Sequence, residues 1–143
     1  MRTISWILLT IVASLTFVAS LGSAYISYRS PDSDVIGQTK LADVAAGRAE
    51  VATALRARRG TAAAFAAAYA VLFLFIVLVP YRRGDVWSWW ALLAGMLVLV
   101  VLTLARIPLL GTRLGAGAAW LELGIVGVAL LLDVKRVSSP AVT

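Results

Sequence analysis

Glu122 is the one ionisable residue well inside an apolar run of this sequence, with Trp120-Leu121 before it and Leu123-Gly124 after it. A lone carboxylate surrounded by hydrocarbon is unfavourable by several kcal/mol, so it must be protonated, paired with a cation or placed beside water. Such a group can serve as a general acid or base, carry a proton, or bind the polar head of a ligand. Glu122 is therefore the first candidate for a functional residue.

Four further polar residues are expected near the same end of the helices as Glu122. At a rise of about 1.5 Å per residue, Glu122 lies roughly 6–9 Å deep and Tyr69 about 12 Å deep, while Arg106 lies at the rim with a stem able to reach inward. The complete predicted cluster is Glu122, Arg106, Tyr69, Thr103 and Ser20. The sequence leaves two interpretations open. The cluster is either a pocket for the polar head of a lipid-soluble ligand, or a structural site in which Glu122 pairs with Arg106 or, protonated, bonds to one hydroxyl.

The absence of histidine and cysteine from the whole sequence limits the chemistry. Without cysteine there are no disulfides, thiolate metal sites or cysteine nucleophiles. Without histidine, the usual haem ligand, general base and imidazole metal ligand are missing. P-loop, GxSxG and HExxH motifs are absent too. We therefore expect no cofactor, no metal site and no catalytic residue, with an enzyme that uses Glu122 as the alternative.

The composition indicates that these residues belong to a membrane protein. Of the 143 residues, 62% are hydrophobic and 14% are charged, and the mean hydropathy is +0.94. A soluble domain carries about a quarter charged residues. The net charge of +6 comes from arginines that crowd the ends of apolar runs, where they can meet phosphate headgroups. We therefore expect a lipid bilayer as the partner and no nucleic acid.

Four apolar runs have about the length that a helix needs to cross a bilayer core of about 30 Å. The predicted fold is all-α, a single membrane domain (residues 1–143) of four transmembrane helices in an antiparallel bundle. The predicted spans are residues 4–24, 61–79, 86–106 and 118–134. The first run has an alternative as a cleaved signal peptide, with Gly22-Ser23-Ala24 as the cleavage site, but its length and single preceding arginine favour a retained helix.

The connection between the first and second spans contains a further predicted helix. Residues 39–59 lack proline and gather apolar side chains roughly on one helical face. They predict an amphipathic interfacial helix that Arg56, Arg58 and Arg59 anchor on lipid headgroups. A solvated connector helix over the mouth of the bundle explains the same pattern, and the sequence leaves both interpretations open.

The second and third spans are separated only by Pro80–Trp90, which reads Pro-Tyr-Arg-Arg-Gly-Asp-Val-Trp-Ser-Trp-Trp. Because this segment is short and charged, it predicts a tight turn at a water interface and an antiparallel hairpin of the two spans. Asp85 is the expected N-cap of the third span. Tryptophan favours the interface, where the ring meets hydrocarbon and the N–H meets water. The predicted interface residues of the turn are Arg82, Arg83, Trp87, Trp89 and Trp90.

The segment Tyr81–Trp90, together with the four-span layout and its long first connection, resembles small bacterial membrane proteins of broadly DoxX-like plan. This resemblance implies a four-helix integral membrane protein and a bacterial source. It carries no catalytic residue over to this sequence. The preference for arginine over lysine and the high alanine content are also typical of a GC-rich bacterium.

The distribution of basic residues bears on the orientation in the membrane. With four spans, the N-terminus, the Arg82-Arg83 turn and the C-terminus share one side. That side holds Arg2, Arg82, Arg83, Lys135 and Arg136 in short segments, whereas the basic residues of the other side are spread over a long connection. Because the positive-inside rule applies best to short segments, we expect a multi-pass protein of the inner (plasma) membrane with both termini cytoplasmic.

Three functions are consistent with these residues. The first is a non-catalytic membrane protein, either an accessory subunit of a membrane complex or a binder of lipid, whose partners are other membrane subunits or further copies of itself. The second is a membrane enzyme acting on a lipid-soluble substrate, with Glu122 as acid or base and with Tyr69 and Arg106 polarising the substrate. The third is a small proton-coupled transporter in which Glu122 carries the proton.

Overall fold

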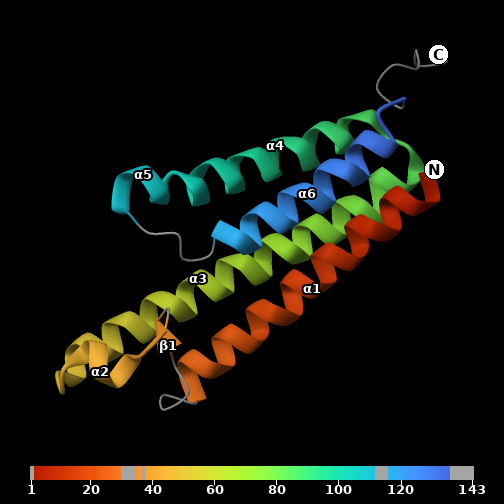
Figure 1. Ribbon diagram of the computed structural model, residues 1–143. Coiled ribbons are helices and arrows are strands. Elements are labelled where there is room, and N and C mark those ends of the chain that lie inside the picture. The colour runs from red at the N-terminus through yellow and green to blue at the C-terminus, as the bar shows by residue number, and fades with distance from the viewer. Residues whose placement is uncertain (1, 30–34, 37, 112–115, 136–143) are drawn as a thin grey trace. The chain divides into compact units, whose positions relative to one another are not determined.

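The computed structural model of the chain describes residues 2–29, 35–36, 38–111 and 116–135 (Figure 1). Nearly all of these residues are helical, so the predicted all-α class is confirmed. The elements are α1 (Arg2–Arg29), β1 (Val35–Ile36), β2 (Thr39–Lys40), α2 (Leu41–Ala45), α3 (Ala49–Ile76), the π-helix η2 (Val77–Tyr81), α4 (Val86–Leu104), α5 (Arg106–Leu110) and α6 (Ala116–Leu132).

Three helices in the described part of the chain are long and apolar enough to cross a membrane. They are Thr3–Arg29, Ala49–Tyr81 and Val86–Leu109. The fourth predicted span corresponds to α6, whose apolar part, Gly117–Leu132, is shorter. At about 1.5 Å per residue, α6 rises about 25 Å, somewhat less than the roughly 30 Å of a bilayer core. The fourth span therefore stays a prediction.

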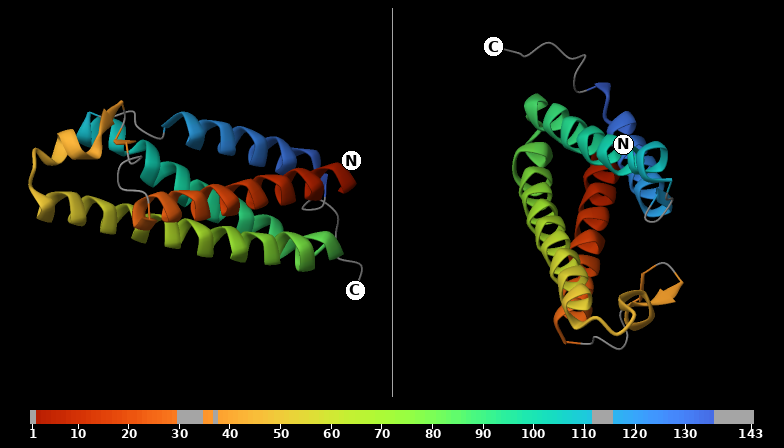
Figure 2. Two further views of the ribbon diagram at one scale, coloured as in Figure 1. Left: turned by 90° about the horizontal axis from the view of Figure 1, so that it is seen from below. Right: turned by 90° about the vertical axis from the view of Figure 1, so that its left-hand side faces the viewer.

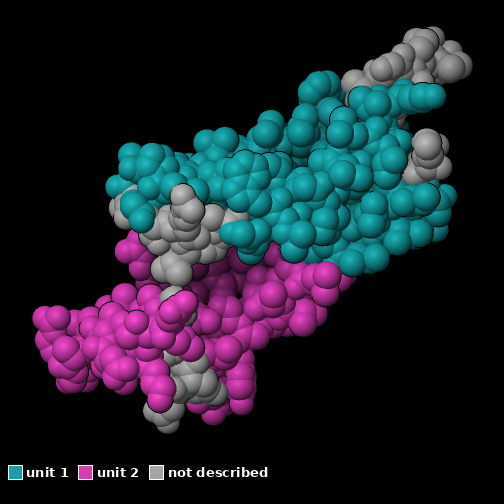
Figure 3. Space-filling model, in the orientation of Figure 1, with its two compact units in different colours: residues 1–13, 72–143 teal, residues 14–71 magenta. Residues whose placement is uncertain are grey.

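The chain divides into two compact units (Figure 3). Unit 1 comprises Met1–Ala13 and Leu72–Thr143, and unit 2 comprises Ser14–Val71. The helices α1 and α3 each contribute residues to both units.

The core of unit 1 lies between α4 and α6, which lie side by side (Figure 1 and Figure 2). Residues of α4 that recur every three or four positions are buried: Ser88, Trp89, Leu92, Met96 and Val100. This spacing places them on one face of the helix. The two helices are antiparallel, because Trp89 near the start of α4 bonds to the carbonyl of Leu130 near the end of α6.

The predicted tight turn between the second and third spans is confirmed. Pro80 lies inside η2, where its missing N–H and its ring are incompatible with an ordinary α-helical turn and favour the wider π-turn. Gly84 then adopts a φ of 105°, which glycine tolerates best. Asp85 is the N-cap of α4 as predicted, but its side chain makes no cap hydrogen bond. The hydroxyl of Ser88 instead donates to the carbonyl of Asp85.

The end of the third span differs slightly from the prediction. The helix α4 ends at Leu104, and α5 follows after a single residue, Ala105. Pro108 has no N–H to donate to the carbonyl of Leu104, which explains the break between the two helices. Because Pro108 falls in the first turn of α5, where proline is tolerated, the chain continues as helix to Leu110.

The predicted amphipathic helix over residues 39–59 is not a single helix in the structure. Its first residues pair in the small β1–β2 ribbon, and α2 ends after one turn at Ala45. Ala46 and Gly47 both have positive φ, 49° and 76°, a geometry that terminates a helix. The predicted single helix through Gly47 is therefore wrong.

The later part of residues 39–59 belongs to the same helix as the second span. From Ala49, α3 runs without a break through Gly60 to Ile76. Glycine weakens a helix interior by about 1 kcal/mol, but Gly60 is buried and a methyl group there would overlap the ring of Tyr28. Close packing within unit 2, not a helix end, therefore accounts for this glycine.

Candidate functional site

The five residues of the predicted polar cluster belong to both units. Thr103 lies in the last turn of α4, Arg106 is the first residue of α5, and Glu122 lies in α6, all in unit 1. Tyr69 in α3 and Ser20 in α1 belong to unit 2. Each set is therefore described by itself, and the five-residue cluster stays a prediction.

Within unit 1, the register of α4 against α6 gives the axial level of Glu122. The bond between Trp89 and Leu130 sets the register of the two antiparallel helices. Eight residues before Leu130 in α6 is Glu122, and eight residues after Trp89 in α4 is Leu97, so these two residues lie at about the same level. Glu122 is then about 9 Å along the axis from the level of Thr103 and about 13 Å from that of Arg106. Both side chains of a Glu122–Arg106 ion pair would have to extend along the bundle to meet. Glu122 is half-buried, and Arg106 is exposed.

Within unit 2, Ser20 and Tyr69 are in different situations. Ser20 is buried, and its hydroxyl donates to the carbonyl of Thr16 at 2.7 Å, one turn earlier in α1. This bond to its own helix satisfies the hydroxyl locally, as is common for serine in a membrane helix. Tyr69 is half-buried, and its phenol oxygen is shielded from the surroundings. Ser20 is therefore poorly suited to bind a ligand.

Two fully buried polar residues of unit 1 lie at the hairpin end, where the sequence predicted interface residues but no ligand site. Ser5 Oγ donates to the carbonyl of Ala129 at 2.6 Å and lies 2.6 Å from the Tyr81 hydroxyl. Either hydroxyl can be the donor in the Ser5–Tyr81 hydrogen bond. Ser5 and Tyr81 are both 0% exposed. We call Ser5, Tyr81 and the Ala129 carbonyl the serine–tyrosine centre, which joins α1, η2 and α6.

The indole of Trp89 makes a second bond to the same end of α6. Its Nε1 donates to the carbonyl of Leu130 at 3.0 Å, next to the carbonyl that Ser5 binds. The last four carbonyls of a helix have no partner in their own ladder. Two other helices thus cap the C-terminus of α6, through a hydroxyl and an indole.

Asp133 is a further buried polar residue at this end of unit 1. It is only 8% exposed, and its N–H donates to the carbonyl of Leu130 at 3.2 Å. The sequence offered one signal for this region, namely polar Ser5 and Asp133 near the ends of otherwise apolar runs. Hydropathy could not show that these ends meet, because Ser5 and Ala129 are 124 positions apart.

The predicted interface residues of the hairpin fall into two groups. Trp87 and Trp90 are exposed, as are Arg82 and Arg83. Trp89 is buried, and a backbone carbonyl rather than water satisfies its N–H. The level of these residues in a membrane stays a prediction, but Trp89 is above all a packing residue of unit 1.

The Arg82 guanidinium lies over the ring of Trp6, with Cζ 5.1 Å from the ring centroid. This cation–π contact links the turn to the start of α1. It also places the Arg82 charge at the same end of unit 1 as the serine–tyrosine centre.

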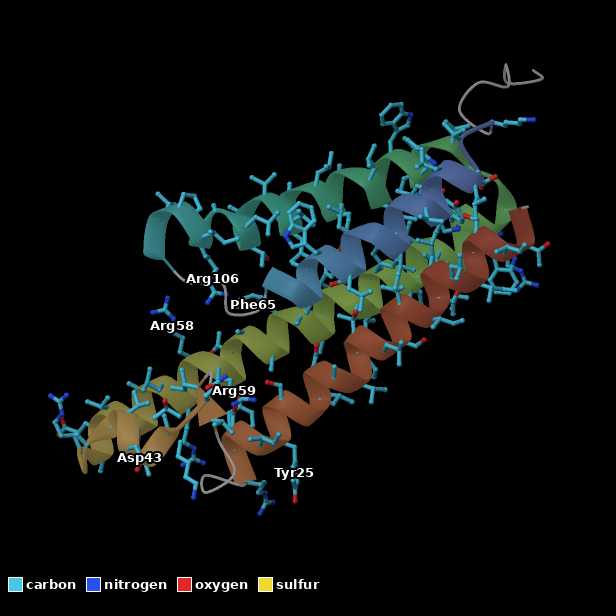
Figure 4. All side chains as sticks on the ribbon, in the orientation of Figure 1. Tyr25, Asp43, Arg58, Arg59, Phe65 and Arg106 are labelled. Carbon is cyan, nitrogen blue, oxygen red and sulfur yellow. The ribbon has the colours of Figure 1, made fainter. Side chains whose placement is uncertain are left out.

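Two of the three predicted anchor arginines in the connection are tied to other elements of unit 2. Arg56 donates to the carbonyls of Ser27 and Tyr28, at 2.8 Å and 3.3 Å. Arg59 donates to Ser23 Oγ at 3.2 Å and to the carbonyl of Val35 at 3.5 Å. Arg58 is exposed and projects from α3 (Figure 4). Arg56 and Arg59 therefore hold α3 to the end of α1 and to β1, and their contact with headgroups stays a prediction.

The described residues line a hollow in unit 2 and a groove in unit 1. In unit 2 a hollow of about 220 Å³ is lined by Val35, Ile36, Leu41, Leu55 and Arg59. In unit 1 a shallow groove of about 400 Å³ runs beside the hairpin turn and is lined only by Phe75, Ile76, Val79, Pro80 and Trp87.

The described residues contain no group of three or more carboxylates able to hold a metal ion. The candidate site of unit 1 consists of the serine–tyrosine centre and the Trp89 indole at the hairpin end. The apolar groove and the exposed Arg82 and Arg83 belong to the same hairpin. No protein-family model, no curated protein and no solved structure matches this chain.

Proposed function

We propose that this chain is a small non-catalytic membrane protein that works as an accessory subunit of a membrane complex or as a binder of lipid. The main support for the proposal is that the buried polar side chains of unit 1 form hydrogen bonds within the protein. Ser5, Tyr81 and Trp89 bond to one another or to the last carbonyls of α6, so these groups stabilise helix packing. Groups committed in this way are poorly placed to bind or transform a substrate.

The exposed apolar surface supports a partner in the membrane. Fewer than a third of the residues in each of the three long apolar helices are buried. Large side chains such as Phe65, Leu72 and Phe75 on α3 are mostly exposed. Such surface needs lipid or another membrane subunit to cover it.

The arrangement of unit 1 supports four spans with one shared end. α6 is antiparallel to α4 and is capped by residues of α1 and α4, so it is proposed to cross the membrane with them. The start of α1, the hairpin turn and the end of α6 meet in this unit. With basic residues dense at this end, we place it, and both termini, on the cytoplasmic side of the plasma membrane.

The proposal is tested by extracting the full chain from its own membrane in mild detergent and identifying what co-purifies by mass spectrometry. The expected result is a stoichiometric set of other membrane subunits, or retained lipid. A chain that is recovered from the soluble fraction, or that turns over a lipid-soluble substrate on its own, would contradict the proposal.

Glu122 supports a second candidate, a membrane enzyme or proton-coupled transporter, because it is half-buried in an apolar helix. Glu122→Gln keeps the shape of the side chain and removes its charge. We expect this variant to accumulate in the membrane and to keep the same co-purifying partners. If it accumulates normally but loses a bound quinone-like molecule or a transport activity, the second candidate replaces the first.

A further inference from the structure

The apolar groove of unit 1 is an open hollow on the protein surface beside the hairpin turn. Phe75, Ile76, Val79 and Pro80 form one wall, and Trp87 at the start of α4 forms the other. Because residues four positions apart share a helix face, Phe75 and Val79 form one ridge and Ile76 and Pro80 another. All five side chains are apolar or aromatic, so the groove suits a hydrocarbon chain.

Two arginines follow the residues of this groove in the chain. Arg82 and Arg83 come directly after η2, and both are exposed. Arg83 lies four residues beyond Val79, about one helical turn, and the Arg82 guanidinium lies over the Trp6 ring. The turn itself contains one acidic residue, Asp85, against these two arginines, so its net charge is positive.

We propose that this groove binds one acyl chain of an anionic phospholipid, with the phosphate held by Arg82 and Arg83. Arginine binds phosphate through its planar, multiply donating guanidinium. The distance from Phe75 to Arg83 along the helix is about 12 Å, which lets the headgroup lie at the arginines while the upper half of the chain lies in the groove. The inference rests on the proposed function and specifies its ligand.

The continuity of charge and groove favours a phospholipid over a free anion. A free phosphate or sulfate would use the arginines and leave the apolar wall unoccupied. A zwitterionic lipid would use the groove, but it would gain less from two arginines, since each contributes about tenfold or less to the binding of an anionic headgroup.

The test is native mass spectrometry of the full chain, released from detergent after titration with phosphatidylglycerol or with phosphatidylcholine of the same acyl chains. We expect the natural chain to bind one phosphatidylglycerol molecule more tightly than it binds further lipid molecules. The affinity for this molecule should be roughly thirty-fold lower in the double variant Arg82→Gln/Arg83→Gln. Val79→Trp, which fills the groove and keeps both arginines, should weaken the same lipid several-fold.

Matched controls separate this site from general effects. Arg29→Gln/Arg48→Gln removes the same charge from exposed positions in unit 2, and Val98→Trp adds the same bulk to an exposed position on α4. Both should leave the tight phosphatidylglycerol unchanged. Helicity measured by circular dichroism identifies any variant that has lost its fold.

A second measurement places the acyl chain directly. Phosphatidylglycerol with brominated acyl chains should quench the fluorescence of Trp87, read as the difference between the natural chain and Trp87→Phe, more than brominated phosphatidylcholine does. Equal quenching by both lipids, or loss of binding in the arginine variant without any effect of Val79→Trp, would overturn the proposal. If either of these two results is obtained while the same membrane subunits still co-purify with the chain, the lipid site is wrong but the proposed accessory function is retained.

Discussion

The two units solve the same problem, the exposed carbonyls at the end of a helix, with different donors. In unit 1, the last turn of α6 is capped by the neutral groups of Ser5 and Trp89, both buried. In unit 2, the last turn of α1 is capped by the charged Arg56, which is only half-buried. A neutral donor avoids the cost of burying a charge, whereas a long charged side chain suits a site that contacts water.

This comparison distinguishes a buried set of capping bonds in unit 1 from a partly exposed set in unit 2. Solvent cannot compensate for the loss of the short buried side chains. Water and ions can replace the bonds of the partly exposed arginine. Substitutions in the two sets should therefore differ in size and in their response to salt.

The largest effect is expected for Ser5→Ala in unit 1. This change removes both hydrogen bonds that Ser5 makes with buried groups, so the free energy of unfolding should fall by about 2–3 kcal/mol. Urea or SDS titration of the chain in micelles measures it. Ser14→Ala, at an exposed position on the same helix, is the control and should change little. Equal effects of the two substitutions would mean that the centre contributes nothing to stability.

A smaller effect is expected for Arg56→Gln in unit 2. The variant loses charged bonds to the carbonyls of Ser27 and Tyr28, so the free energy of unfolding should fall by about 1 kcal/mol, a value reduced by partial exposure. Raising the salt concentration to about 0.5 M should shrink this difference and leave that of Ser5→Ala unchanged. Arg58→Gln serves as the control. A salt dependence of the same size for Ser5→Ala would contradict the distinction between buried and partly exposed capping bonds.

The smallest net effect is expected for Gly60→Ala, also in unit 2. Alanine strengthens the helix interior by about 1 kcal/mol, but its methyl group must displace the ring of Tyr28, which is 59% exposed and able to move. With Tyr28 present, the gain in helix propensity and the cost of displacing the Tyr28 ring oppose each other. In a Tyr28→Ala background, the same substitution should stabilise by about 1 kcal/mol. The absence of this gain in a double-mutant cycle would show that Tyr28 does not restrict position 60.

The sequence predicted the features that depend on local pattern. The apolar runs around α1, α3 and α4 and the short charged stretch at Gly84 were sufficient to locate three long helices and a hairpin turn. These features follow from hydropathy and from the conformational freedom of glycine, both of which are properties of neighbouring residues.

The sequence could not predict the features that depend on distant partners. Ser5 and Tyr81 are 76 positions apart, and nothing in either segment shows that the other will supply a hydrogen bond. Trp89 was assigned to the interface because hydropathy does not distinguish burial against protein from contact with lipid. Gly60 was read as the border between a connector and a span because its packing partner, Tyr28, lies in another helix. The predicted cluster around Glu122 has the same weakness, since its residues come from five helices.

The unbroken helix Ala49–Tyr81 fixes how the chain can respond to membrane thickness. Its 33 residues rise about 50 Å, whereas a bilayer core is about 30 Å thick. The excess of about 20 Å corresponds to its first turns, which carry Glu50, Arg56 and Arg59. We expect these charges to keep the first turns out of hydrocarbon, so that tilting of the helix or deformation of the lipid would accommodate a thinner or thicker bilayer. We therefore expect the chain to be sensitive to the lipid composition of its membrane even where it binds no particular lipid.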